Sequence, residues 1–169
     1  MSQLVAGIAD CKVSADTGAV LVTYALGSCV GLIIHDPVAQ VGGLLHILLP
    51  DSRLDPAEAV RNPFKFADTG IPEMFHQAYR LGAEKQRLRV YVLGGACVMD
   101  EDGVFAVGSK NVLAARKILW RAGVFIRGEE TGGIASRTVR LEMSTGRVYV
   151  RMPGAPERCV LEATASKTG

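Results

Sequence analysis

The sequence predicts a mixed α/β protein in which strands come first, helices follow, and strands return near the end. Two β-branched and apolar runs begin this order at residues 19–26 and 30–34, and a third run follows the glycine pair at 42–43. Apolar residues at helical spacing replace these runs in the middle of the chain, and alternating residues return at 137–151. Together, the three observations favour sheets combined with helices over an all-helical protein.

Each predicted strand ends at a glycine, a proline or a polar turn. The third run, LLHILLP, ends near residue 50, and a further strand at 88–93 ends at the glycine pair 94–95. Residues 137–151 read as a β-hairpin around the Ser-Thr-Gly turn at 144–146. We expect one domain over 1–169, with a loose tail from about 153 because that stretch is small and polar.

Two helices are predicted between the strands. Gly70 and Pro72 disfavour an early start for the first helix, so we expect it at 73–81. The second helix is expected to follow Ser109 as its N-terminal cap and to end at Gly123. Its apolar stripe, which is interpreted as core packing, consists of Val112, Ala115, Leu119 and Ala122.

The amino-acid composition favours a folded globular protein and argues against one that binds nucleic acid. Hydrophobic residues make up 49% and charged residues 21% of the 169 residues, close to the averages of globular proteins, which argues against disorder. The formal net charge is +2 and the basic residues are scattered, so no nucleic-acid partner is expected.

The expected compartment is the cytoplasm, with no insertion into a membrane. The first residues show no secretory signal pattern, and no run reaches the roughly 18 apolar residues of a membrane span. In the cytoplasm the cysteines are expected to be reduced thiols. Neither they nor the histidines have the close spacing of metal ligands, so no metal or organic cofactor is expected. The residues concerned are Cys11, Cys29, Cys97, Cys159, His35, His46 and His76.

The candidate chemistry lies in the first fifty residues. Cys29 follows Gly27 and Ser28 between two strand-like runs, where a tight turn could expose its sulfur beside free backbone N–H groups. His46 lies in an apolar strand, where a polar ring needs hydrogen-bond partners. If the imidazole reaches the sulfur, it can hold the reactive thiolate. Taken singly, however, Cys29 reads more readily as a small core residue, and His46 as a buried structural residue.

The motifs around these two residues resemble the CheD family of chemoreceptor glutamine deamidases. The resemblance rests on TYALGSCVGLIIHD at 23–36 and GGLLHILLP at 42–50. Further segments agree in order and spacing, so that the resemblance covers nearly the whole chain: FADTGIPEMF at 66–75, LGGA at 93–96, GSKN at 108–111 and ETGGIASRTVRLEMSTGRV at 130–148.

The resemblance implies a fold and a set of functional residues. The implied fold has three layers, α/β/β, similar to that of the bacterial cytotoxic necrotizing factor deamidases. Cys29 takes the place of the family's nucleophile, His46 of its general acid and base, and Thr23 of the residue that orients the histidine. Backbone amides near Gly27 and Ser28 are then expected to stabilise an oxyanion.

The implied activity is that of a protein-glutamine glutaminase acting on methyl-accepting chemotaxis proteins through a thioester on Cys29. A CheC-type phosphatase is a further partner implied by the resemblance. Two alternatives stay open from the residues themselves. One is a non-catalytic module that binds such a phosphatase, and the other is a different Cys-His thiol hydrolase, such as a cysteine peptidase or a transglutaminase-like enzyme.

Overall fold

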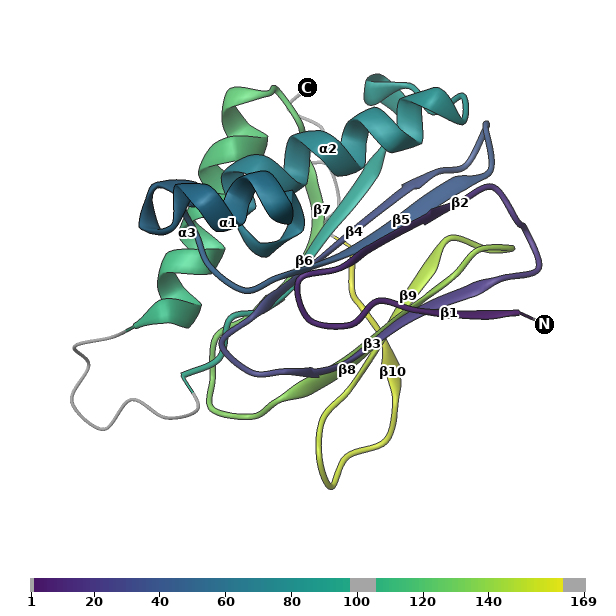
Figure 1. Ribbon diagram of the computed structural model, residues 1–169. Coiled ribbons are helices and arrows are strands. Elements are labelled where there is room, and N and C mark those ends of the chain that lie inside the picture. The colour runs from purple at the N-terminus through teal and green to yellow at the C-terminus, as the bar shows by residue number, and fades with distance from the viewer. Residues whose placement is uncertain (1, 98–105, 163–169) are drawn as a thin grey trace, which may run out of the picture.

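The computed structural model describes residues 2–97 and 106–162, and these residues form three layers (Figure 1). Two five-stranded sheets are stacked face to face, and helices cover the free face of one of them. The sheet that packs against the helices is called the middle sheet, and the second sheet is called the outer sheet. The expected α/β/β arrangement with mixed sheets is confirmed.

The outer sheet has the strand order β1-β3-β8-β9-β10. The pairing of β1 with β3 is parallel, and the other pairings are antiparallel. A four-residue turn joins β8 to β9, as the Ser-Thr-Gly motif predicts. The strands are β1 (Gln3–Val5), β3 (Val20–Leu26), β8 (Arg137–Glu142), β9 (Arg147–Arg151) and β10 (Arg158–Cys159).

The middle sheet has the order β2-β5-β4-β6-β7, in which only β6 and β7 run parallel. Strands β4 and β5 are buried along their full length because both of their faces are covered. The strands are β2 (Cys11–Ser14), β4 (Val30–Asp36), β5 (Val41–Ile47), β6 (Arg89–Gly94) and β7 (Ile126–Thr131).

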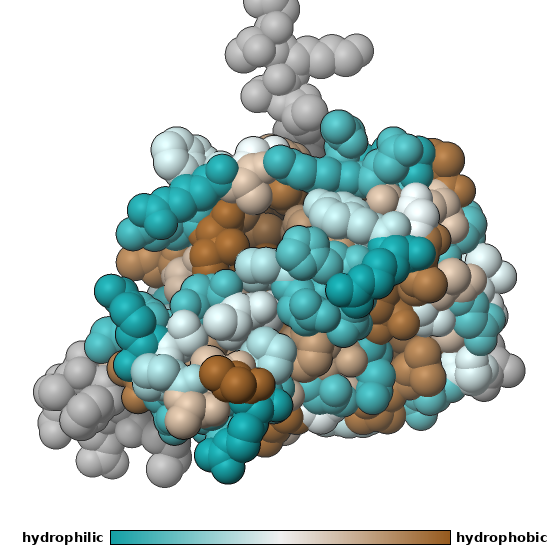
Figure 2. Space-filling model, turned by 45° about the horizontal axis from the view of Figure 1, so that its top comes forward, coloured by the Kyte–Doolittle hydropathy of each residue, from teal (hydrophilic) through white to brown (hydrophobic). Residues whose placement is uncertain are grey.

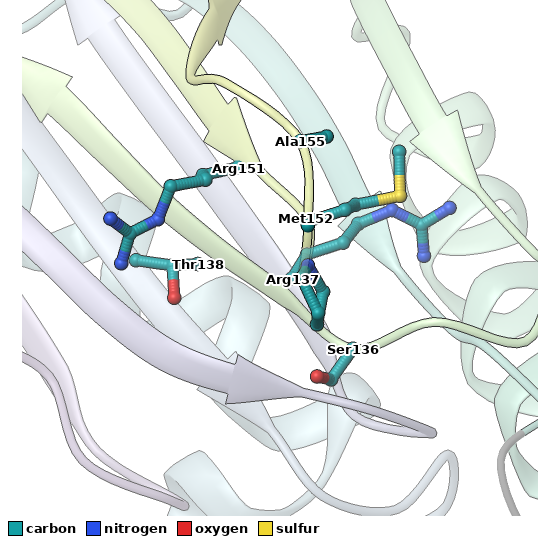
Figure 3. Close-up of a pocket in the computed structure, with 8 residues that line it drawn as sticks. Ser136, Arg137, Thr138, Arg151, Met152 and Ala155 are labelled. Carbon is teal, nitrogen blue, oxygen red and sulfur yellow. The ribbon is translucent and has the colours of Figure 1, made fainter.

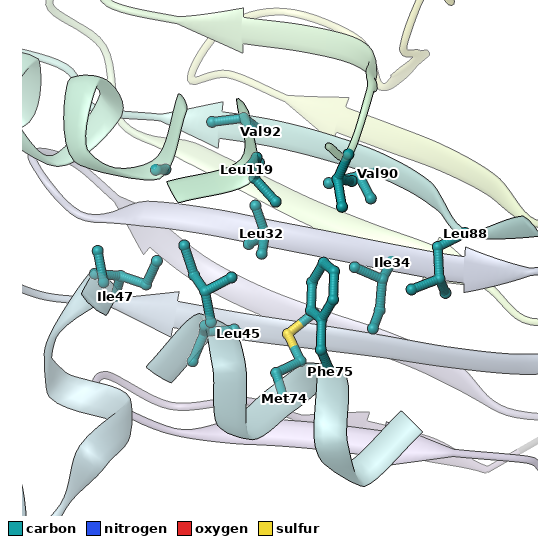
Figure 4. Close-up of a cluster of buried hydrophobic side chains, with 14 of the residues drawn as sticks. Leu32, Ile34, Leu45, Ile47, Met74, Phe75, Leu88, Val90, Val92 and Leu119 are labelled. Carbon is teal, nitrogen blue, oxygen red and sulfur yellow. The ribbon is translucent and has the colours of Figure 1, made fainter. Parts of the chain in front are cut away.

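The helix layer packs one apolar face of each long helix on the middle sheet. Met74 and Phe75 of α2 and Leu119 of α3 lie over the even-numbered side chains of β4, such as Leu32 and Ile34 (Figure 4). The helices are α1 (Pro56–Arg61), α2 (Ala67–Arg80) and α3 (Val107–Arg121), with single 3-10 turns at Ser52–Leu54, Pro63–Lys65 and Lys85–Arg87.

A second core fills the space between the two sheets. It takes the opposite faces of β4 and β5, including Ile33 and Leu44, and packs them on Leu21, Val139 and Leu141 of the outer sheet. Because side chains alternate along a strand, the odd-numbered residues of β4 and the even-numbered residues of β5 face this interlayer core. Cys29 and His46 therefore belong to the same face of the middle sheet.

Both helix starts differ from the prediction. Helix α2 begins at Ala67, six residues before the expected start at 73, and contains Pro72. Gly70 lets the first turn of α2 pack closely on the backbone of Phe64, because a Cβ at position 70 would lie 3.2 Å from the Cα of Phe64. This packing offsets the cost of a proline inside the helix. Helix α3 begins at Val107, which places Ser109 inside the helix, and no side chain caps its first turn.

The end of α3 and the stripe on its inner face agree with the sequence. Gly123 adopts a φ of 72° after the helix, and its N–H donates to the carbonyl of Trp120 at 3.0 Å. The N–H of Val124 returns to the carbonyl of Leu119 at 2.9 Å. Three residues of the predicted stripe are buried, Val112, Ala115 and Leu119, whereas Ala122 is exposed.

The C-terminal stretch is more ordered than the loose tail expected from about 153. Arg158 and Cys159 pair with β9, and Val160 is buried in the interlayer core. Glu162 accepts a hydrogen bond from the Tyr91 hydroxyl at 2.7 Å. Two paired residues leave no periodic pattern in a sequence, which explains the difference. Residues 163–169 lie outside the described part of the chain.

The outer surface of the helix layer is mainly hydrophilic, with separate apolar groups (Figure 2). Leu113, Trp120 and Phe125 are exposed large apolar side chains that line an open hollow of about 680 Å³ between α3 and β7. Within the described residues, none of the helices has both the length and the apolar character needed to cross a bilayer.

Candidate active site

The sequence around Cys29 forms a bulged strand end followed by a turn. Strand β3 carries a bulge between Thr23 and Leu26, so that both of these side chains face the interlayer core although three positions separate them. Ala25, within the bulge, has a left-handed φ of 57°. The N–H of Gly27 then donates to the carbonyl of Ala25 at 2.9 Å, and the chain turns into Cys29 and β4. The predicted turn between the two strands is thus present.

Thr23 and His46 meet across the two sheets. The Thr23 hydroxyl donates to the carbonyl of Ala6 at 2.6 Å, which uses its only hydrogen. The oxygen of Thr23 therefore accepts from Nδ1–H of His46, at 2.8 Å. This contact selects the tautomer of His46 that has a bare Nε2, because a neutral imidazole carries one hydrogen.

The bare Nε2 of His46 lies on the same face as Cys29. Gly31 is the direct partner of His46 in the β4–β5 register, so Cys29 is its diagonal neighbour on that face. Nε2 is buried and has no hydrogen-bond partner among the described residues. No hydrogen bond joins Cys29 to His46, both of which are described, in this resting arrangement. Catalytic hydrogen bonds are often loose before substrate binds.

Burial favours the neutral forms of Cys29 and His46. It raises the pKa of the Cys29 thiol, which its own backbone N–H lowers to a smaller extent. Burial also lowers the pKa of His46, against the opposing charge of Asp10. Both shifts favour the neutral thiol and the neutral imidazole over the thiolate and imidazolium. An imidazole of this kind can act as a general base during attack.

Cys29 is the most exposed member of the trio formed by Cys29, His46 and Thr23. Cys29 is 8% exposed, whereas His46 is 1% and Thr23 0% exposed. A ligand that reaches this site would thus meet Cys29 before the more deeply buried histidine and threonine.

The turn that carries Cys29 holds two N–H groups that bond to no oxygen of the described residues. Among the described residues, neither the Ser28 nor the Cys29 backbone N–H has an oxygen acceptor, and the Cys29 N–H contacts only its own sulfur. The carbonyls of Gly27 and Cys29 accept from the N–H groups of Ala96 and Gly95. Two such N–H donors beside a thiol can stabilise negative charge on an oxygen. The turn thus has the donors that an oxyanion site requires.

Comparison with known proteins identifies the family. The family model described as CheD chemotactic sensory transduction matches residues 48–152. The chain belongs to the CheD family. The relatives that carry the name "Probable chemoreceptor glutamine deamidase CheD" include one from Solibacter usitatus, 50% identical over 95% of this chain and 95% of its own. A relative from Syntrophus aciditrophicus, named CheD 1, is 49% identical over 94% and 99%, respectively.

The family also extends to archaea. A CheD relative from Pyrococcus horikoshii is 40% identical over 89% of this chain and 93% of its own. Among solved structures, a Neisseria meningitidis protein aligns with 78% of this chain and 63% of its own length, at 12% identity and a TM-score of 0.44. The relatives in sequence, rather than this solved structure, identify the family.

The described pockets lie away from this CheD trio. One of about 500 Å³ is formed where β8 begins and β9 ends, and its Arg137 and Arg151 side chains point to opposite sides (Figure 3). The guanidinium of Arg137 donates to the carbonyls of Gly94, at 3.4 Å, and Gly132, at 2.9 Å. Arg137 thus supports the glycine segment next to Cys29, and neither Cys29 nor His46 lines a described pocket.

None of the other cysteines shares the face that carries Cys29 and His46, as far as the core contacts assign them: Cys11 pairs with Leu45, next to His46, but packs on the helix side of the sheet. Cys11 is in β2, where burial raises the pKa of its thiol to about 12, and Cys97 and Cys159 are exposed. All four cysteines are free thiols. Within the described ranges, no group of three or more His, Cys, Asp or Glu side chains could hold a metal ion.

Two contributors to the CheD site were not predicted. The first is the carbonyl of Ala6, directly after β1, which accepts the hydrogen bond from the Thr23 hydroxyl. No sequence pattern identifies a backbone carbonyl with such a role. Asn111 donates to the carbonyls of Ser28 and Leu48. A signal for Asn111 does exist, because this polar residue lies one helical turn before Ala115 on the apolar stripe.

Proposed function

We propose that this chain is a chemoreceptor glutamine deamidase, which hydrolyses glutamine side chains of methyl-accepting chemotaxis proteins to glutamate and releases ammonia. The observation that carries the proposal is the contact of Thr23 with His46 Nδ1, which leaves a bare Nε2 on the face shared with Cys29. The names of the relatives supply the substrate class. Because the proposed substrate is the cytoplasmic part of a receptor, we propose that the enzyme works in the cytoplasm.

The first half of the reaction forms a thioester. His46 Nε2 takes the proton of the Cys29 thiol as the sulfur attacks the carboxamide carbon of the glutamine. The carbonyl oxygen becomes an oxyanion, which the N–H groups of Ser28 and Cys29 stabilise. The C–N bond then breaks, and the imidazolium returns the proton to the leaving nitrogen, so that ammonia departs.

The second half consumes one water molecule. His46 Nε2 takes a proton from the water as its oxygen attacks the thioester carbon. The second oxyanion collapses, the C–S bond breaks, and the Cys29 sulfur recovers its proton from His46. The net change is glutamine plus water to glutamate plus ammonia.

The role of Thr23 in this scheme is to orient the base. Its hydroxyl hydrogen is held by Ala6, so the oxygen can only accept from His46 Nδ1. When Nε2 gains a proton, the same contact favours the imidazolium, because a hydrogen bond from a charged donor is stronger than one from a neutral donor.

The product carries new negative charge. Each deamidated glutamine becomes a carboxylate, and like charges on neighbouring helical positions repel one another. On a helical receptor this charge can shift the balance between two signalling states.

The decisive experiment is the incubation of a receptor's cytoplasmic fragment with the enzyme in oxygen-18 water. Deamidation adds about 1 Da, and the heavy oxygen about 2 Da more, at each modified glutamine, because water supplies the new oxygen. We expect this shift together with ammonia release from the wild type. Cys29→Ala is expected to abolish both, whereas Cys97→Ala, at an exposed cysteine, is the matched control.

The same experiment separates the other thiol enzymes. A peptidase would cut the receptor backbone, and a transglutaminase would attach an added primary amine, such as methylamine, in place of water. The deamidase proposal would be contradicted if the wild type left the glutamines of a folded receptor fragment unchanged. It would also be contradicted if Cys29→Ala modified them as much as the wild type does.

A CheC-type phosphatase is a second proposed partner, and the support for it is the family resemblance alone. Binding is tested by size-exclusion chromatography of the two purified proteins, with Cys29→Ala as well as the wild type. Co-migration of both forms would mean that binding does not need the thiol, and separate elution would contradict the partnership.

A further inference from the structure

The three carbonyls of the nucleophile turn, residues 27–29, are each bonded from outside the turn. In chain order they accept from the backbone N–H of Ala96 at 2.7 Å, from the side chain of Asn111 at 2.9 Å, and from the backbone N–H of Gly95 at 2.8 Å. The first and third donors are backbone groups just beyond the pairing of β4 with β6, which ends at Val30 and Gly94. The middle donor comes from a helix and is a side chain, so it depends on one residue identity.

Asn111 also joins the two halves of the site. Its Nδ2 has two hydrogens, and it donates one to Ser28 and the other to the carbonyl of Leu48 at 3.0 Å. Leu48 directly follows β5, the strand that carries His46. One buried amide group therefore holds the nucleophile turn against the end of the histidine strand.

The contact with Ser28 determines the direction of the next N–H. The described chain has no cis peptide bond, and in a trans peptide the C=O and N–H point in opposite directions. With the Ser28 carbonyl held toward α3, the N–H of Cys29 points away from α3. This N–H lies beside its own sulfur, since it lowers the pKa of the Cys29 thiol.

Asn111 is an unfavourable choice for packing alone. Its side chain is 0% exposed, and its Oδ1 has no hydrogen-bond partner among the described residues. A buried acceptor without a donor costs stability, and the neighbours on the stripe are apolar. Packing on the stripe alone would favour an apolar residue here, so the two contacts with the carbonyls of Ser28 and Leu48 account for the asparagine.

We propose that Asn111 is a positioning residue, which fixes the peptide between Ser28 and Cys29 so that the Cys29 N–H meets the oxyanion formed at the sulfur. The inference rests on the proposed function and deepens it. Asn111 of the helix layer would then help to stabilise the transition state without touching the substrate, because it orients the peptide whose N–H binds the oxyanion.

The test compares two reactions of the same sulfur in the full-length protein. Acylation of Cys29 by p-nitrophenyl acetate passes through an oxyanion, whereas alkylation by iodoacetamide displaces iodide and forms none. Both rates are read at Cys29 by peptide mass spectrometry, because Cys97 and Cys159 are exposed and also react. Neither reaction requires a receptor, so the outcome does not depend on the deamidase proposal.

Asn111→Ala and Asn111→Leu both remove the donor, and leucine keeps the branched shape if alanine fails to fold. We expect acylation to slow about 10- to 100-fold in each, and alkylation to change less than about threefold. With receptor as substrate, kcat should fall as acylation does while KM changes little. Leu119→Val, on the same helix and away from the turn, is the control for loss of stability.

An equal fall in acylation and alkylation would overturn the proposal, because Asn111 would then support only the thiol or the fold. Unchanged acylation in a folded variant would overturn it as well. A wild type that acylates in an Asn111-dependent manner but leaves receptor glutamines intact would contradict the deamidase and leave the positioning role in place.

Discussion

Two buried histidines occupy opposite ends of the same pair of strands. His35 of β4 and His46 of β5 are each 1% exposed, and both face the interlayer core. Each also lies directly across from a glycine, because the register pairs His35 with Gly42 and Gly31 with His46. In sequence and in burial the two residues are thus closely alike.

They differ in what surrounds the free nitrogen. His35 donates from Nε2 to the carbonyl of Met143 at 3.3 Å, and its bare Nδ1 faces Gly146. His46 uses the other nitrogen as donor, to Thr23, and its bare Nε2 shares a face with Cys29. Burial with one unpaired nitrogen is therefore not sufficient for a catalytic site. What distinguishes His46 is the proposed nucleophile, Cys29, at the same end of the strands.

The largest expected effect is the contrast between His46→Gln and His35→Gln. The first removes the proposed base, so kcat for glutamine deamidation should fall by about 10²- to 10⁴-fold. The second should leave kcat per folded molecule within about threefold, although it disturbs a buried contact with Met143. Ammonia release from a receptor fragment measures both, and equal losses would remove the distinction between the two residues.

Thr23→Val tests the contact that selects the tautomer of His46. The substitution keeps the shape of the side chain but removes the acceptor for Nδ1–H, and we expect kcat to fall about 10-fold or more. Thr23→Ser retains the hydroxyl and should recover most of the activity. If valine and serine behave alike, the hydroxyl has no part in orienting the histidine.

The pH profile of kcat/KM tests the protonation states of His46 and Cys29 before substrate binds. Burial lowers the pKa of His46 below its ordinary 6.5, and burial raises the pKa of Cys29 above its ordinary 9.0. A base must be neutral, so activity should rise about tenfold per pH unit below the pKa of His46 and then stay level to above pH 9.0. A rate of Cys29 alkylation that is already maximal at pH 6 would instead indicate a thiolate at rest.

The smallest expected effect concerns the His35 end alone. Gly146 has a φ of 74°, and a Cβ there would lie 2.6 Å from Nδ1 of His35. Gly146→Ala should therefore lower the free energy of unfolding by about 1 to 3 kcal/mol and leave kcat unchanged. Gly154→Ala is the matched control, since its φ is 75° and nothing lies within 4 Å of the added carbon. Equal losses in both variants would mean that backbone strain, and not His35, sets the cost.

The long strands of the fold could be predicted because burial on one or both faces leaves a pattern. The apolar runs of β3 to β6 and the hairpin of β8 and β9 were located from the sequence. Strands β1, β2, β7 and β10 were missed. They are short or partly exposed, and pairing with a neighbour rather than local preference makes them strands.

The CheD site could be predicted only through its motif. A separation of 17 positions between Cys29 and His46 says nothing about distance, and the prediction depended on a family resemblance. Their shared face comes from the β4–β5 register, and the contact with Thr23 from the stacking of two sheets. Both are tertiary facts that no local pattern contains. Their catalytic roles stay predictions.

The Thr23–His46 contact has a consequence for how the protein fails on heating. Its two residues belong to different sheets, and side-chain contacts rather than backbone pairing hold those sheets face to face. A compact intermediate that kept its secondary structure but let the layers slide would already be inactive. Loss of turnover should then coincide with loss of near-ultraviolet circular dichroism, ahead of the far-ultraviolet signal in any heat or acid titration that populates such a state.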